Sequence, residues 1–490
     1  MTTPKWVKDA VFYQIFPDRF AKSDRNPSGN LPFESWDSPP TVHGFKGGDL
    51  YGATEKLDYL QKLGVTAIYF NPVFESASNH RYHTYDYYNV DPLLGGNDAL
   101  KKLLREAHKR EIRIVLDGVF NHASRGFWQF HHVLENGKGS PYINWFYFDP
   151  ERLEGRRHWG AYPATRELHD LKNGESSLKA IGYQAWWNLP ALPKFNTNSP
   201  AVREFLFGVA EYWINFGIDG WRLDVPGEIN DDEFWREFRR RVRAINPEAY
   251  IVGEIWHDAQ RWLQGDQFDA VMNYPIAALA MNFFSAKHLN FDVIQHAGGI
   301  KDRIRPINAH DAANELDRLL HLYLEDITYA QLNLLDSHDM PRFLSCASGD
   351  KEALKLAWLF MFTIPGAPCI YYGDEVGVDG GHDPDCRKAF PWDESKWDKD
   401  LLEYAKACIA LRTKHAPLRR GSYKRVYAEG EVLVYSRSYG AENLVIAFNA
   451  SMEEKTLDLF PNKRPGILFG KPSFSGNQIL IPSRSGVVLK

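Results

Sequence analysis

Acidic side chains come at or just after the ends of several short apolar runs in this chain of 490 residues. They are Asp117, Asp224, Glu254 and the pair Asp336 and Asp339. A carboxylate at the end of a buried strand costs free energy unless it is paired or put to use. Cleavage of a glycosidic bond needs one carboxylate that faces the anomeric carbon and one carboxylic acid that faces the leaving oxygen. The acids are therefore of the right type for that chemistry.

Basic and ring side chains accompany these acids. Arg222 stands two residues before Asp224, so on one strand both side chains point to the same side and Arg222 can keep Asp224 ionised. His122 and His338 follow two other runs. Each acid alone has a structural explanation, such as a turn cap or a single ion pair. Several strands that end in this way are hard to explain by structure alone.

The elements that must position these residues alternate regularly over the first 400 residues. Amphipathic helical patterns separate eight short runs rich in β-branched and aromatic residues. The runs are Ala10–Phe16, Ala67–Val73, Arg113–Phe120, Asp219–Val225, Ala249–Trp256, Asp269–Tyr274, Gln331–Asp336 and Cys369–Tyr372. Eight such units favour an α/β fold with a closed (β/α)₈ barrel over an open doubly wound sheet. In such a barrel, all carboxyl ends of the strands open into one bowl.

Two further units interrupt or follow this alternation. The stretch after the third run is too long for a structureless loop, so we expect a small inserted domain B over residues 122–198. The barrel then comprises residues 1–121 and 199–415. Beyond it, short β-rich segments separated by Gly, Asn and Pro predict a C-terminal antiparallel β-sandwich domain at 416–490.

Composition narrows the class of partner. The formal net charge is −5, so there is no basic excess for gripping a nucleic acid. The four cysteines have no zinc-like spacing and read as free thiols in a reducing compartment. The chain shows neither a secretory signal nor an apolar run of about 18 residues that could span a membrane. These features predict a cytoplasmic protein that contacts neither nucleic acid nor membrane.

Four ordered motifs carry a resemblance to a known family. They are Asp117-Gly118-Val119-Phe120-Asn121-His122, Gly220-Trp221-Arg222-Leu223-Asp224, Gly253-Glu254-Ile255-Trp256 and Leu335-Asp336-Ser337-His338-Asp339. With them the chain resembles glycoside hydrolase family thirteen, the α-amylase family, over essentially its whole length. The runs Ala10–Phe20, Leu192–Asn196 and Trp256–Ala259 are similar to the cyclomaltodextrinase, neopullulanase and maltogenic amylase group.

The resemblance implies roles for individual residues. Asp224 would be the nucleophile, Glu254 the general acid/base, and Asp339 would hold the sugar hydroxyls. A retaining mechanism predicts that the carboxyls of Asp224 and Glu254 lie about 5–5.5 Å apart. The acid must be protonated near neutral pH, so we expect a raised pKa for Glu254. The implied substrate contacts are Tyr82, Asp117, His122, Arg222, Trp256, His338, Asp383 and Arg387.

Some positions depart from the family pattern or stay open. Trp186 and Trp187 either line the groove or fill the inserted domain. The resembling enzymes have an additional N-terminal domain that forms a dimer lid, whereas the first strand here begins near residue 10. We therefore expect a monomer, or a dimer not built from that domain. Gly227 lacks a side chain near the acceptor site, so acceptor preference would differ from that of the group.

The resemblance also bears on cofactors. No cofactor is expected to be required, but some members hold calcium where the loop after the first strand meets Gly47-Gly48-Asp49. Asp24, Asn26 and Asp49 offer oxygen ligands there. Lys22, however, occupies a usual ligand position, and its ammonium would repel the ion. We expect Lys22 to replace the metal by an ion pair with Asp24 or Asp49. The alternative is that Lys22 points to solvent and a weakened calcium site remains.

The reaction implied by the resemblance is hydrolysis of α-1,4 bonds in cyclodextrins, maltooligosaccharides and related α-glucans, through a covalent glycosyl-enzyme. One alternative keeps the site but makes the protein a transglycosylase, or a hydrolase of an unusual cyclic or α-1,6-linked glucooligosaccharide. Hypotheses of a different class are a catalytically inactive binding subunit and a metal-dependent lyase. The presence of all three catalytic acids argues against the inactive subunit, and retained activity in EDTA would exclude the lyase.

Overall fold

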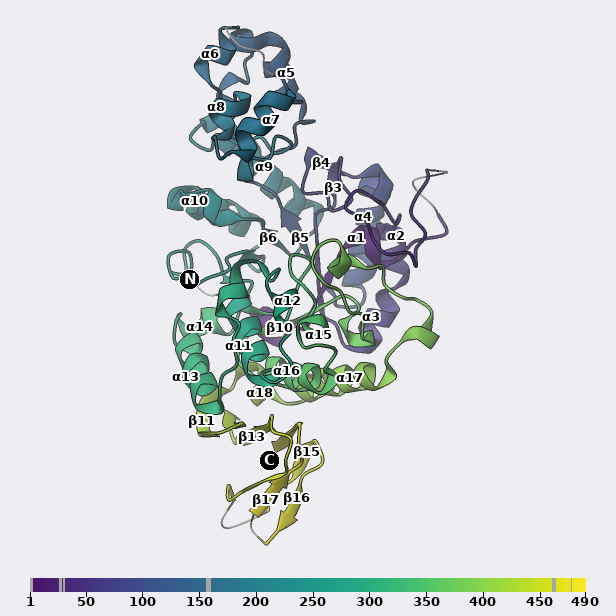
Figure 1. Ribbon diagram of the computed structural model, residues 1–490, viewed down its shortest axis with the longest axis vertical. Coiled ribbons are helices and arrows are strands. Elements are labelled where there is room, and N and C mark those ends of the chain that lie inside the picture. The colour runs from purple at the N-terminus through teal and green to yellow at the C-terminus, as the bar shows by residue number, and fades with distance from the viewer. Residues whose placement is uncertain (1–2, 26–28, 30, 156–159, 461–463, 477) are drawn as a thin grey trace.

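Eight parallel strands form the centre of the computed structural model, which describes residues 3–25, 29, 31–155, 160–460, 464–476 and 478–490 (Figure 1). In chain order the strands are β1 (Phe12–Ile15), β2 (Ala67–Phe70), β5 (Arg113–Gly118), β6 (Gly220–Leu223), β7 (Tyr250–Gly253), β8 (Ala270–Val271), β9 (Leu332–Asn333) and β10 (Ala367–Tyr371). Each strand pairs with the next one along the chain, and β10 pairs with β1. A parallel bridge between Met272 and Leu332 joins β8 to β9 and closes the barrel. The predicted barrel is confirmed, with strands shorter than the predicted runs.

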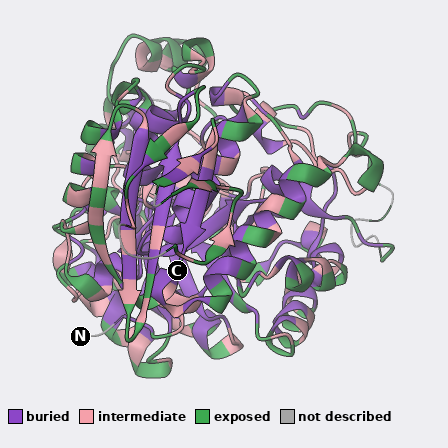
Figure 2. Cartoon of the chain, turned by 90° about the horizontal axis from the view of Figure 1, so that it is seen from below, coloured by how far each residue is buried: buried purple, intermediate pink, exposed green. Residues whose placement is uncertain are grey.

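The strands are mostly apolar, which suits a barrel that helices cover on the outside. The four residues of β1, β2, β6 and β7 are all buried, as expected for parallel strands covered on both faces. Buried residues gather at the centre of the molecule, and exposed residues lie on the outer surfaces of the surrounding helices (Figure 2). The barrel interior is therefore a packed core, and chemistry is confined to its rim.

Helices surround the barrel. The longer ones are α3 (Leu57–Leu63), α4 (Gly96–His108), α9 (Pro200–Phe216), α10 (Asp232–Ile245), α11 (Tyr274–Phe284), α13 (Ala309–Leu320), α16 (Lys351–Thr363) and α17 (Lys399–Lys414). Helix α9 shows why they begin and end where they do. It starts with Pro200, whose fixed φ suits the first helical position, and it ends at Gly217, which adopts the left-handed conformation at φ 119°.

Shorter elements shape the rim. The helices are α1 (Pro17–Phe20), α2 (Leu50–Glu55), α12 (Phe291–Ile294), α14 (Glu325–Thr328), α15 (Phe343–Cys346) and α18 (Ala416–Arg420). Strands β3 (Phe74–Ser76) and β4 (Thr84–Val90) form an antiparallel hairpin after β2. The sequence analysis did not predict this hairpin. Buried and exposed positions do not alternate regularly along β4, so it lacks the pattern that identifies a half-buried strand. The turn of the hairpin carries Tyr82.

The segment inserted after β5 contains α5 (Trp128–Asn136), α6 (Pro150–Leu153), α7 (Thr165–Lys172) and α8 (Ser177–Ile181). These helices lie at one end of the long axis of the molecule (Figure 1). An isolated antiparallel bridge joins the two ends of the segment, with His122 opposite Lys194, and another places Phe146 opposite Phe195. The predicted insertion after the third barrel strand is confirmed.

The C-terminal part is antiparallel, as predicted, and lies at the opposite end of the long axis (Figure 1). One sheet has the order β11-β12-β13-β18-β15 and a second has the order β14-β17-β16. The bounds are β11 (Ser422–Glu429), β12 (Val432–Tyr439), β13 (Glu442–Asn449), β14 (Lys455–Leu457), β15 (Ile467–Phe469), β16 (Ser473–Ser475), β17 (Gln478–Ile481) and β18 (Ser485–Leu489). An apolar cluster of residues from both sheets, including Val434, Ile479 and Val487, fills the space between them.

A membrane crossing requires a helix that is both long and apolar. Not one helix in the described part of the chain meets both requirements.

Candidate active site

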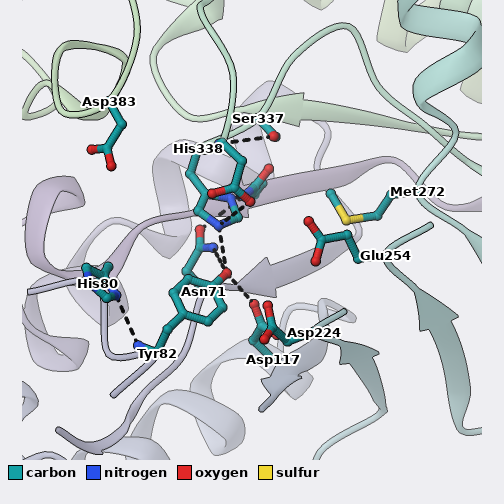
Figure 3. A network of polar contacts seen from close by, with 12 residues as sticks. Asn71, His80, Tyr82, Asp117, Asp224, Glu254, Met272, Ser337, His338 and Asp383 are labelled. Carbon is teal, nitrogen blue, oxygen red and sulfur yellow. Dashed lines mark hydrogen bonds and ion pairs between the residues drawn. The ribbon is translucent and has the colours of Figure 1, made fainter. Parts of the chain in front are cut away.

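The chain places Asp224 and Glu254 at the same rim of the barrel. Asp224 follows β6, and its N–H donates to the carbonyl of Gly118 at 3.0 Å. Glu254 follows β7, and its N–H donates to the carbonyl of Leu223 at 3.0 Å. Both side chains are buried, and both face the same space, together with Asp117 and Tyr82 (Figure 3). The predicted meeting of these strand ends is therefore observed.

Arg222 links the carboxylates of three strand ends. Its Nη1 donates to both oxygens of Asp117 at 2.9 Å and to Oδ1 of Asp224 at 3.2 Å. Its Nη2 lies 2.9 Å from Oε2 of Glu254, at an angle outside hydrogen-bonding geometry. The guanidinium is fully buried. A buried cation without these acids would be strongly destabilising, so Arg222 and the acids require one another.

One oxygen of Asp224 stays available. Oδ1 is held by Arg222, whereas Oδ2 has no hydrogen-bond partner among the described residues. An unpaired carboxylate oxygen in a buried site is costly and is expected where a substrate supplies the missing partner. Asp224 therefore keeps one buried oxygen beside the bowl without a partner from the described part of the protein.

Val225, directly after Asp224, has an unusual backbone. Its φ of 37° and ψ of 49° lie in the left-handed region, which β-branched residues rarely adopt. In this conformation the Val225 N–H donates to Oε2 of Glu254 at 3.1 Å. Backbone strain of this kind persists where the surroundings enforce it, and it often marks an active site. Here the strained turn connects the two carboxylates.

Burial controls the protonation of the two acids. Burial first, and then the negative charge of Asp339, raise the pKa of Glu254 from its ordinary value of 4.5 to about 7, against the opposing effect of Arg222. Burial and the neighbouring Glu254 also raise the pKa of Asp224. Two adjacent buried carboxyls with raised pKa values hold a proton between them near neutral pH. The raised pKa expected for Glu254 agrees with this arrangement.

Trp256 contacts the acid directly. Its indole Nε1 donates to Oε1 of Glu254 at 3.1 Å. Its ring stacks on Tyr274 with 3.6 Å between ring centroids and 8° between planes. Gly298 and Gly299 pack so closely on it that a Cβ at either would lie within 2.9 Å of Trp256 atoms. The indole is thus fixed by packing, and the ring face on Tyr274 is closed to a sugar.

Asp117 and Tyr82 form the floor of the bowl. The hydroxyls of Tyr82 and Tyr69 donate to Oδ2 of Asp117 at 2.8 Å and 2.9 Å. Asn71 donates its side-chain amide to the Tyr82 oxygen at 3.0 Å. These contacts fix the Tyr82 ring at the base of the site (Figure 3). Tyr69 and Asn71 were not predicted, although a polar residue at the end of β2 is a signal of the kind used for the other strands.

His338 continues this network. Gln14 donates its side-chain amide to Nδ1 of His338 at 2.9 Å, so the proton of the neutral ring is on Nε2. Nε2 lies 2.6 Å from the Tyr82 hydroxyl and 3.0 Å from Oδ2 of Asp339. Burial lowers the pKa of His338, which favours the neutral ring. Gln14 also escaped prediction, although a glutamine inside the otherwise apolar β1 is itself a signal.

Asp339 is held on its other side by Arg387. Nη2 of Arg387 lies 3.2 Å from Oδ1 of Asp339, and Nη1 lies 3.0 Å from Oδ1 of Asp383. Burial opposes ionisation of Asp339, but the hydrogen bond from His338 and the positive charge of Arg387 outweigh it and lower the pKa of this carboxyl. Asp339 is thus an anion at neutral pH. Asp383 lies across His338 from Glu254, toward the edge of the bowl (Figure 3).

His122 lines the site from the end of β5. The ring is fully buried, and its Nε2 has no hydrogen-bond partner among the described residues. Burial lowers the pKa of His122 to about 3, so the ring is neutral. The unpaired nitrogen is buried, and such an atom is expected where a ligand supplies the missing partner. All eleven predicted site residues therefore gather around one bowl, with Asp383 at its edge.

The predicted ion pair of Lys22 is wrong. Lys22 is exposed and lies over the ring of Phe33, and neither Asp24 nor Asp49 contacts it. The reason is that Asp49 is already used: Oδ2 accepts from the N–H and hydroxyl of Ser23, and Oδ1 caps α2. Asn26 lies outside the described residues. Among those described, no group of three or more His, Cys, Asp or Glu side chains could hold a metal ion.

Comparison with known proteins agrees with the geometry. The model of the α-amylase catalytic domain matches residues 14–414, and the model of the α-amylase C-terminal domain matches residues 421–463. This chain belongs to the α-amylase family. A cyclomaltodextrinase from a Bacillus species is 44% identical over 95% of this chain and 77% of its own length.

Solved structures of family members are similar over the full length. The debranching enzyme of Nostoc punctiforme is 45% identical with a TM-score of 0.86, covering 100% of this chain and 99% of its own. The cyclic α-maltosyl-(1→6)-maltose hydrolase of Arthrobacter globiformis is 35% identical with a TM-score of 0.85, covering 100% of each chain. The family assignment makes this chain an α-glucan glycoside hydrolase.

Proposed function

We propose that this protein is a retaining hydrolase of α-1,4-glucosidic bonds in cyclodextrins, maltooligosaccharides and related α-glucans. The observation that carries the proposal is the paired site of Asp224 and Glu254 around one buried guanidinium. One acid offers a free oxygen, and the other has a pKa of about 7. A retaining glycosidase needs these two functions side by side.

In the first step, Oδ2 of Asp224 attacks the anomeric carbon while Glu254 gives its proton to the glycosidic oxygen. The C–O bond to the leaving sugar breaks, and that sugar departs with a free hydroxyl. An ester between the glycosyl unit and Asp224 remains. Before the reaction, the two carboxyls share one proton. This proton lies on Glu254 once the glycosidic oxygen accepts a hydrogen bond from that carboxyl.

In the second step, the ionised Glu254 takes a proton from water, and the water oxygen attacks the anomeric carbon. The ester bond breaks, and Asp224 returns as a carboxylate that Arg222 stabilises. The two displacements together retain the anomeric configuration. Water enters as one hydroxyl on each product, so atoms and charges balance.

The remaining groups bind the sugar. The hydroxyls of the reacting ring would meet an anion, hydrogen-bond acceptors and hydrogen-bond donors, which are supplied by Asp339, Asp117, His122 and His338. Tyr82 offers a ring face. Trp256 acts on Glu254 instead, since its N–H orients the carboxyl. Arg387 positions Asp339 from the edge of the bowl.

A second candidate substrate class is favoured by the full-length structural matches. One such neighbour is a debranching enzyme, and another is a hydrolase of a cyclic saccharide with 1→6 links. Action on α-1,6-linked or cyclic glucooligosaccharides, or transfer to a sugar acceptor, therefore stands beside α-1,4 hydrolysis. The same carboxylates would perform each reaction.

A substrate panel tests the proposal. It comprises β-cyclodextrin, maltotriose, pullulan, starch and panose, with products identified with and without added maltose. The proposal expects small or cyclic α-1,4 substrates to react faster than starch. Selective cleavage of the 1→6 bond in panose would favour the second candidate, and no release of sugar from any substrate would refute both.

A further inference from the structure

A column of three parallel rings leads from the bowl to solvent. The ring of His122 stacks on Trp186 with 5.0 Å between centroids and 7° between planes. Trp186 in turn stacks on Trp187 at 4.5 Å and 11°. His122 is fully buried, whereas Trp187 is 75% exposed. The column therefore begins at a residue of the candidate site and ends in a large, exposed aromatic face.

The backbone at the outer end of this column is strained. Trp187 has φ 50° and ψ 27°, and Asn188 has φ 56°. Two successive non-glycine residues in the left-handed region cost free energy, and the surrounding structure must enforce them. Exposure of a tryptophan on such a backbone does not stabilise the fold. Strain together with exposure points to a function for the ring.

A pocket of about 430 Å³ adjoins the exposed ring. Its lining includes Lys194, whose Nζ donates to the carbonyl of Glu228 at 2.9 Å and lies 3.6 Å from Oε2 of Glu228. The lining of the pocket is thus partly aromatic and partly charged, which suits a sugar with an apolar face and hydroxyl edges. Its lining includes Gln184, Trp186, Trp187, Asn188, Lys194 and Glu228.

A short segment of chain connects this pocket to the acid. Glu228 ends the 3-10 helix η6 (Pro226–Glu228), which follows the strained Val225 that donates to Glu254. The acid must face the leaving oxygen, so the leaving sugar lies on this side. Asp383 lies beyond His338, on the opposite side of the bowl (Figure 3).

We propose that the exposed face of Trp187, backed by Trp186 and His122, is the platform on which a glucosyl unit of the leaving group or acceptor stacks. This inference rests on the proposed function. It makes Trp187 a specificity-determining residue, which acts on sugars that extend beyond the cleaved bond. A substrate whose leaving group is too small to reach the platform should not depend on it.

Two substrates separate these cases. α-Maltosyl fluoride releases fluoride, which cannot reach Trp187, whereas maltotetraose releases a sugar. We expect Trp187→Ala to lower kcat/KM for maltotetraose, and the fraction of maltosyl transferred to added maltose, by about tenfold, the size of losing one apolar contact face. Fluoride release should stay within about twofold of wild type, and Trp187→Phe should restore most of the loss.

Two further variants exclude a structural effect. Trp128→Ala removes another exposed tryptophan of the inserted segment and should leave every rate unchanged. Trp187→Gly fits the left-handed backbone, so it should not lower the melting temperature, yet it should show the loss seen with alanine. Equal effects of Trp187→Ala on both substrates, or no effect on either, would overturn the platform alone. Wild-type enzyme inactive on both substrates would overturn the proposed function and the platform with it.

Discussion

Replacement of Trp256 by phenylalanine tests how the acid is held. Phenylalanine keeps a ring on Tyr274 but removes the N–H that donates to Oε1 of Glu254 at 3.1 Å. Donation to a carboxylate favours the ionised form and lowers its pKa. Loss of the donor therefore raises the pKa of Glu254 above about 7.

The magnitude follows from the type of bond. A hydrogen bond to a charged group contributes about 1.5–3 kcal/mol, and one pKa unit corresponds to about 1.4 kcal/mol. Because Trp256 is partly exposed, we take the lower end. The pKa should rise by about one unit. The alkaline limb of kcat/KM against pH, which reports the general acid, should move up by the same amount.

The assay is the pH dependence of kcat/KM for the best small substrate of the panel. Trp6→Phe serves as the control, because it also removes an indole hydrogen bond, to the carbonyl of Glu248, away from the bowl. An unmoved alkaline limb in Trp256→Phe, with a loss confined to KM for longer substrates, would show that Trp256 binds sugar instead of holding the acid.

Three other predictions concern the residues around the acids. Arg222→Lys should lower kcat by at least about a hundredfold, because a lysine ammonium cannot bridge Asp117, Asp224 and Glu254 as the guanidinium does. Steady-state kinetics measure this loss, and circular dichroism checks that the variant is folded. The pKa of Glu254 is about 7 in the folded protein, above its ordinary value of 4.5. Ionisation of Glu254 therefore lowers the free energy of unfolding progressively as the pH rises from 4.5 to about 7. Glu254→Gln lacks this ionisation, so its stability advantage over wild type in urea titrations should grow by roughly 2–3 kcal/mol over this pH range. A difference in unfolding free energy that does not change with pH would contradict the raised pKa. Asp49→Ala removes the side-chain cap of α2 and should lower the free energy of unfolding by about 2 kcal/mol, whereas Lys22→Ala should change it by less than about 0.5 kcal/mol. A large loss of stability in Lys22→Ala, or a marked fall in melting temperature in EDTA, would instead support calcium binding between the loop after β1 and Gly47-Gly48-Asp49.

The sequence predicted the barrel and the meeting of its acids because both follow from local patterns. Short apolar runs fix the strands, and parallel strands bring residues such as Asp117, Asp224 and Glu254 to one rim. The hairpin β3–β4 has no such regular pattern, so it was not predicted. Its turn nevertheless delivers Tyr82 to the site, which the family motif had indicated.

Contacts that depend on packing between distant segments could not be predicted. The indole of Trp256 reaches Glu254 only because Tyr274 and the turn at Gly298 fix its ring. Lys22 was assigned an ion pair from its position in the sequence, but Asp49 is occupied by nearer backbone and hydroxyl donors. Burial and competing partners decide such contacts, and neither can be read from spacing. The oligomeric state, the cytoplasmic location and the absence of a required cofactor remain predictions.

The most direct test of the central claim is to trap the glycosyl-enzyme. The Glu254→Gln variant would be incubated with α-maltosyl fluoride, whose leaving group needs no proton from the acid, and then digested and analysed by mass spectrometry. The account predicts a maltosyl ester on the peptide that contains Asp224, and wild-type products whose first-formed anomer is α by NMR. Release of the β anomer with no adduct on Asp224 would contradict it, because that outcome means a single displacement by water.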